Sequence, residues 1–186
     1  SDLVMLDEQI RLRTAQRDGA KTALSFFDGR PLDLQLFFES FWAVLPGYSV
    51  IPSRNTMDEV LSSGSLRLVR DSRVRDALLD LYALYARISF LEAHMARDYD
   101  RYLYDPIFSS IPFKYQGPWG TDPSDLAAAQ TVLDKLTIEN GLRLAAINIE
   151  GEAGLLELLA SARAKVLRLL DLIPLDDAAW CPCFAN

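Results

Sequence analysis

The amino-acid sequence predicts an all-α protein, an antiparallel helical bundle with two long helices at about 72–105 and 139–173 and several shorter ones. Apolar residues recur at spacings of three and four along most of the chain, which is the period of one helix face. Residues that start and end helices flank these stretches, and the sequence lacks strand signals. The length of 186 residues fits one domain, so we assign 1–173 to a single bundle and 174–186 to a C-terminal tail.

The first two helices are predicted at about 2–27 and 32–45, separated by the helix-breaking residues of 28–31. Arg13 and Arg17 interrupt the apolar stripe of the first helix. The other residues of that stripe are Leu3, Leu6, Ile10, Ala20, Leu24 and Phe27. The second helix carries an aromatic stripe that we expect to face the core. Its members are Phe37, Phe38, Phe41 and Trp42.

The clearest predicted helix covers 72–105, beginning at an N-cap on Asp71 or Ser72 and ending at Pro106. Its apolar residues alternate spacings of three and four, as in a coiled-coil seam, and Glu92 stands at the one missed position. The seam consists of Val74, Leu78, Leu81, Tyr85, Ile88, Met95, Tyr99 and Tyr102. A shorter helix before it is predicted from the capping box that begins at Thr56, and we expect it to end at Gly64.

The longest irregular stretch is 106–123, which contains four prolines and two glycines. Loops of this length without regular structure are uncommon and are often functional. Four aromatic residues within it are candidates for a lid that closes one end of the bundle or, if exposed, for an interaction site. They are Phe108, Phe113, Tyr115 and Trp119.

The C-terminal third is predicted to hold a helix from Asp122 to about 137 and the second long helix at 139–173. Gly151 and Gly154 interrupt the long helix and indicate a kink or a close helix crossing. The expected buried stripe comprises Leu142, Ala145, Ile149, Leu156, Leu159, Val166, Leu169, Leu170 and Ile173.

The charge balance disfavours two classes of partner. Nineteen Lys and Arg residues stand against 26 Asp and Glu, for a formal net charge of −7. Nucleic acids and anionic membrane surfaces are bound through an excess of basic residues, so we expect neither as a partner. No run of 18 or more apolar residues is present, and the chain opens directly into a helical pattern, so we expect neither a transmembrane helix nor a signal peptide within it.

No catalytic, cofactor-binding or metal-binding residues are predicted. His94 is the only histidine, and a zinc site needs several His or Cys ligands. Asp98, Asp100 and Asp105 lack the spacing of a calcium loop and are typical of a solvated acidic face. Cys181 and Cys183 are one residue too close for a redox Cys-x-x-Cys motif, which leaves an ordinary tail or metal binding between chains.

The segment 55–69 combines the capped helical turn with the pattern Ser-x-Gly-x-Leu at Ser62 to Leu66, an apolar pair, and then the start of a long helix. Together with 133–144, this resembles a family of bacterial membrane-tethered proteins known only as a domain of unknown function, and the likeness spans about 2–173. The resemblance implies a membrane helix preceding Ser1 and a domain in the cell envelope, facing the periplasm or the exterior. It implies no catalytic residues.

The sequence therefore leaves three functions open. The first is a non-enzymatic extracytoplasmic domain that binds a protein partner or a second copy of itself. The alternative is a sensor that binds a small ligand in a pocket near the 106–123 loop, and the third is an enzyme of unrecognised type. An exposed apolar patch on a long helix favours the first, and a large apolar pocket with convergent polar groups favours the second.

Overall fold

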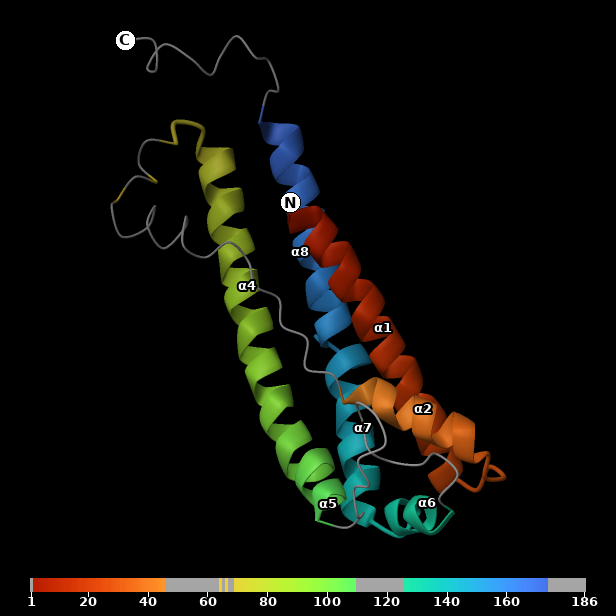
Figure 1. The fold of residues 1–186 in the computed structure, drawn as a ribbon. Helices are drawn as coiled ribbons and strands as arrows, with labels where there is room; N and C mark the ends of the chain where they lie inside the picture. Colours follow the sequence, from red (N-terminus) through yellow and green to blue (C-terminus); the bar gives the residue numbers. More distant parts are fainter. Residues whose placement is uncertain (1, 46–63, 65, 67–68, 110–125, 174–186) are drawn as a thin grey trace, which may run out of the picture.

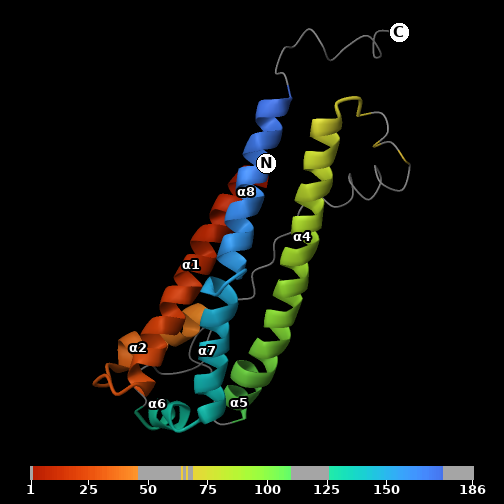
Figure 2. The same ribbon diagram turned by 180° about the vertical axis from the view of Figure 1, so that it is seen from behind.

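The protein is built from three long helical columns (Figure 1). The computed structural model describes residues 2–45, 64, 66, 69–109 and 126–173, and all regular structure among them is helical. The columns are α1 (Asp2–Phe27), α4 (Ser72–Tyr99), and α7 (Leu136–Glu150) continued by α8 (Leu155–Leu172). Figures 1 and 2 show the α7–α8 column between α1 and α4 and antiparallel to both. The predicted all-α antiparallel bundle is thus confirmed.

The first two helices form a tight hairpin at one end of the columns. After α1, Gly29 adopts a φ of +95°, the left-handed conformation that commonly follows a helix. Asp33 then caps α2 (Leu34–Val44) by accepting a hydrogen bond from the backbone N–H of Leu36 at 3.1 Å. The two helices approach closely at Gly19, where a Cβ atom would lie 2.7 Å from the carbonyl oxygen of Ser40. A glycine is required at this crossing because no larger residue fits.

The aromatic residues of α2 lie in the core, as predicted. Phe37, Phe38 and Phe41 are almost completely buried, while Trp42 is half-buried. The ring of Phe37 makes edge contacts with Phe38 and with Phe26 of α1 and stacks on Phe41, with centroids 5.3–6.0 Å apart. The sequence predicted that Phe27 of α1 lies in the buried stripe. In the structure Phe26 is buried instead, and Phe27 is only half-buried.

The prediction that Pro106 ends the α4 helix was wrong. Asp71 caps α4 as predicted, but the helix then widens into a π-helical segment, η2 (Asp100–Tyr104), and continues as α5 (Asp105–Phe108). In η2 the N–H of Asp105 donates to the carbonyl of Asp100, five residues earlier. Because of this wide turn, α5 begins anew at Asp105 and Pro106 stands in its first turn. Proline is tolerated there, since the backbone N–H groups of a first turn have no acceptor within the helix.

The wide turn also changes which residues are buried. It adds one residue to the helix, so the core position that the α-helical spacing assigned to Tyr102 falls on Leu103. Leu103 is fully buried and Tyr102 only half-buried. The buried seam therefore continues from Tyr99 to Leu103 and Ile107. Glycine lets α7 pack against η2 here, since a Cβ at Gly141 would lie 2.9 Å from the Tyr102 carbonyl oxygen.

The second long helix, predicted at 139–173, is two helices. The α7 helix begins at Leu136 and ends before Gly151, and α8 begins after Gly154. Both glycines have extended backbone, and Ala153 between them adopts a φ of +56°. A Cβ at Gly151 would lie 2.6 Å from the Ile147 carbonyl oxygen, so the chain leaves the helix where only glycine fits. The sequence indicated a kink or a close helix crossing at the two glycines, and the structure has a complete break between two helices there.

Several other boundaries differ from the prediction or lie outside the described residues. The helix predicted up to about 137 is α6 (Leu126–Leu133), which ends in a turn before α7. Its predicted start at Asp122, the capping box at Thr56 and the 174–186 tail lie outside the described residues. In the described part of the chain, no helix is both long enough and apolar enough to cross a lipid bilayer.

Candidate functional site

The aromatic residues of the 106–123 loop are mostly outside the part of the chain that the structure describes. Phe108 is the last residue of α5, and only its backbone is described. Phe113, Tyr115 and Trp119 lie outside the described residues, as do Cys181 and Cys183. The lid and the interaction site predicted for this loop therefore remain predictions.

The polar residues near the end of α4 do not come together as a metal site. His94 is half-exposed, and its Nε2 lies 3.4 Å from the carboxylate of Asp98. Asp98 also accepts a hydrogen bond from the side chain of Asn148 on α7 at 3.4 Å. Asp100 and Asp105 are exposed. Within the described ranges, no three His, Cys, Asp or Glu side chains are grouped so that they could hold a metal ion.

A buried ion pair joins the two helices whose apolar stripes the sequence showed to be interrupted. Arg13 of α1 and Glu92 of α4 lie 2.9 Å apart, with side chains only 3% and 9% exposed. Arg13 belongs to the buried side of α1 and Glu92 to the buried seam of α4. The two residues that interrupt the apolar stripes are therefore each other's counter-charge, and their ion pair connects α1 with α4.

The hydrogen bonds continue from this ion pair to the end of α2. Arg13 donates to the side-chain oxygen of Gln16 at 2.8 Å, and Gln16 donates to the backbone carbonyl of Val44 at 2.7 Å. The hydroxyl of Tyr104, in η2, donates to the carbonyl of Leu45. The last carbonyls of a helix have no partner within it, so these side chains satisfy groups that would otherwise be costly to bury. The buried hydroxyl of Tyr99 lies close enough to Arg13 and Tyr104 for their charges to act on its pKa. We refer to Arg13, Gln16, Glu92, Tyr99 and Tyr104 as the polar cluster.

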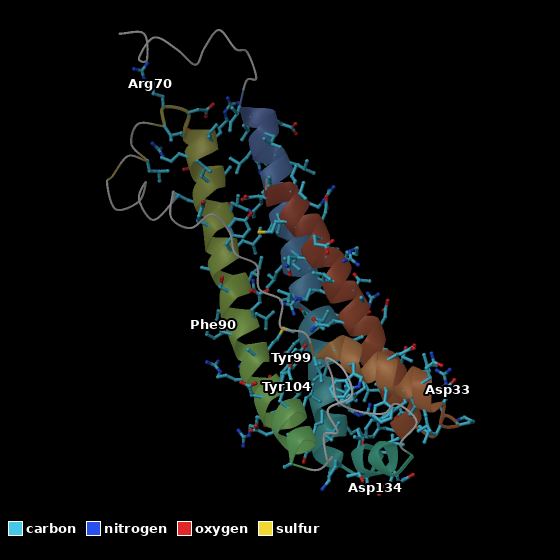
Figure 3. The ribbon with its side chains drawn as sticks, viewed as in Figure 1. Asp33, Arg70, Phe90, Tyr99, Tyr104 and Asp134 are labelled. Carbon is cyan, nitrogen blue, oxygen red and sulfur yellow. The ribbon has the colours of Figure 1, made fainter. Side chains whose placement is uncertain are left out.

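Tyr99 is the one member of the polar cluster whose hydroxyl has no hydrogen-bond partner among the described residues. Figure 3 shows Tyr99 and Tyr104 on the side of the α4–η2 column that faces the bundle. Burial raises the pKa of Tyr99 to about 12, although the charge of Arg13 acts in the opposite direction. Near neutral pH this phenol is therefore uncharged. With the carboxylate of Glu92 already paired, the arrangement is that of a structural network.

We expect Tyr99→Phe to reduce the alkaline sensitivity of the fold. The folded-state pKa lies above the ordinary value of 10.0, so the stabilisation from the neutral phenol is complete below pH 10 and is lost as the pH rises towards 12. Urea unfolding should show that the variant matches or exceeds the wild type at pH 8 and loses about 1 kcal/mol less by pH 11. An identical pH dependence for both proteins would contradict this assignment.

The outward side of α4 carries a second, exposed row of apolar residues. Phe90 is 72% exposed and Leu79 is 41% exposed, because both lie on the side of α4 opposite its buried seam. Figure 3 shows the side chain of Phe90 pointing away from the bundle. The residues of this row alternate spacings of four and three. We call this row the outer face of α4. Its apolar members are Leu79, Ala83, Ala86, Phe90 and Ala93, and the charged residue Arg97 ends it.

Comparison with known proteins adds no assignment to these features. A scan against protein-family models, a search of curated proteins and a search of solved structures each returned no match. The resemblance to the membrane-tethered family thus remains a prediction, and the polar cluster and the outer face of α4 are the features of the described residues that bear on function. Sequence reasoning identified neither, although Phe90 could be recognised as a large aromatic residue opposite a coiled-coil-like seam.

Proposed function

We propose that the chain is a non-enzymatic helical domain that binds a protein partner through the outer face of α4. The observation that carries the proposal is the exposure of Phe90. A helix at the surface of a bundle normally presents charged or polar residues to solvent, whereas the outer face of α4 presents an aromatic ring, a leucine and three alanines, with one charged residue, Arg97, at its end. Exposed apolar rows of this kind mark interaction sites, and aromatic residues are enriched in interface cores.

The polar cluster supports the proposal because it fixes the helix that carries the face. Arg13 and Glu92 hold α4 against α1, and Tyr104 ties the following turn to the end of α2. The outer face is therefore presented on a rigid support, which lowers the entropy lost when a partner binds. The two charged groups of the cluster are paired with each other, which fits a scaffold.

The cellular location in this proposal rests on the resemblance alone. It places the domain in the cell envelope, attached to the inner membrane by a helix preceding Ser1 and facing the periplasm or the exterior. The ligand-sensor alternative depends on the 106–123 loop, most of which lies outside the described residues.

Photo-cross-linking in the cells that produce the protein tests the proposal. A benzophenone amino acid at position 90 is expected to form a covalent adduct with another protein chain. The matched control is position 4, because Val4 is apolar, 69% exposed and located on α1 instead of α4. No adduct from position 90, or equally strong adducts from both positions, would refute the outer face as a binding surface.

A further inference from the structure

We infer that the outer face of α4 binds the same face of a second copy of this chain, with the two α4 helices antiparallel and related by a twofold axis that passes between Ala83 and Ala86 of the outer face. This inference rests on the proposed function and names its partner. It follows from the spacing, the side-chain sizes and the charges of the outer face, which complement one another in a single register.

The spacing of the outer face is that of a coiled-coil seam. Its positions alternate steps of four and three residues from Leu79 to Arg97, and the part that pairs with itself in the register below, from Leu79 to Phe90, covers about 17 Å of helix. In an antiparallel pair, successive layers match one residue of each copy. With the axis between Ala83 and Ala86, Leu79 of one copy meets Phe90 of the other, and Ala83 meets Ala86.

Side-chain sizes in this register are complementary. The two alanine layers lie at the centre, where small residues let the helix axes approach closely. The two layers of Leu79 against Phe90 lie on either side and cover the largest exposed apolar side chains of α4. Because the contact is the same for both copies, each favourable layer occurs twice, as in other twofold-symmetric interfaces.

The charges beside the seam favour the antiparallel orientation. Asp80 and Arg87 flank the outer face on one side, and the antiparallel register places Asp80 of each copy beside Arg87 of the other. The Asp80 side chain is 69% exposed even with Lys165 beside it, and Arg87 is exposed and forms no ion pair with any described residue. A parallel pair would instead set this flank against the one that carries Tyr82 and Ser89, which offers no opposite charge.

The contact is small, so the dimer should be weak. One pair of helices over this length falls at the low end of interface sizes, where complexes are transient. Sedimentation velocity from about 5 to about 500 μM should therefore show the mass rising from the monomer value of 20.9 kDa towards twice that value. Association that depends on concentration over this range is the expected result.

Substitutions of Phe90 and of a matched control test the surface. Phe90→Asp should weaken association at least about tenfold, because it places a charge in a desolvated layer. Val4→Asp changes an equally exposed apolar residue on α1 and should leave association unchanged. Circular dichroism melting must show that both variants remain folded. A chain that is monomeric throughout, or a dimer that Phe90→Asp leaves intact, overturns the inference.

A charge exchange tests the register. Arg87→Asp and Asp80→Arg should each weaken the dimer, and the variant that carries both should recover it, because only the antiparallel pair brings these residues together. Failure of the double variant to recover overturns the register proposed here. If the chain does not dimerise but position 90 still cross-links to a different protein, the inference fails and the proposed function stands; if neither occurs, both fail.

Discussion

Replacing Glu92 with leucine is expected to lower the free energy of unfolding by about 3–5 kcal/mol, since it leaves the guanidinium of Arg13 buried without its counter-charge. Arg13 also donates to Gln16, and Gln16 donates to the end of α2, so the change disturbs the contact between three helices. Chemical denaturation near neutral pH measures the loss directly. Size-exclusion chromatography distinguishes a destabilised fold from an aggregated one.

The double-mutant cycle with Arg13→Met provides the control. Either substitution alone leaves a buried charge unpaired, whereas the variant with both buries no charge. We expect the double variant to be clearly more stable than the sum of the two single losses predicts. The double variant should still be less stable than the wild type, because the side-chain oxygen of Gln16 no longer receives the hydrogen bond that Arg13 donates. Additive losses would show that Arg13 and Glu92 contribute independently, contrary to the ion pair described above.

Truncation of Phe37 should have an effect of similar size. Its ring is fully buried and contacts Phe26, Phe38 and Phe41, so Phe37→Ala removes a large apolar side chain and leaves a cavity. Such changes typically cost about 3–5 kcal/mol. Urea unfolding of the purified variant provides the measurement, at a concentration low enough for the monomer to predominate.

Phe90→Ala is the matched control for Phe37→Ala, because it removes the same side chain from a position that is 72% exposed. We expect its effect on monomer stability to stay within about 0.5 kcal/mol. A small loss at Phe37 would mean that the α1–α2 hairpin does not form the described core. A large loss at Phe90 would mean that its ring is buried within the monomer and is not available to a partner.

The sequence predicted the helices whose signals are local. The start of α4 follows from Asp71 as N-cap, and the buried face of α2 follows from its aromatic spacing, and both are confirmed. The end of α4 and the continuity of the second long helix depended on tertiary packing. Proline normally ends a helix, and only the wide turn of η2 makes Pro106 acceptable within one. Gly151 and Gly154 were recognised as weak points, but sequence alone does not distinguish a kink from a break.

The polar cluster was visible in the sequence only as two exceptions. Arg13 and Glu92 each occupied a position where an apolar residue was expected, and they carry opposite charges. Pairing them requires the arrangement of α1 and α4, because the two residues are 79 positions apart in the chain and both helices pack against α7 and α8. Phe90 escaped notice because it belongs to no apolar stripe of the predicted core, which is also the reason that it marks a surface.

The π-helical turn in η2 has a consequence for how this protein tolerates changes in length. Core residues before it follow the spacing of an ordinary helix up to Tyr99, and core residues after it follow the same spacing from Leu103 onwards. The segment thus behaves as an α-helix into which one residue has been inserted, with the insertion confined to a single turn. Insertions are usually accommodated in surface loops. Here the helix itself takes up the extra residue, and the packing of Leu103 and Ile107 is kept in phase with the rest of α4.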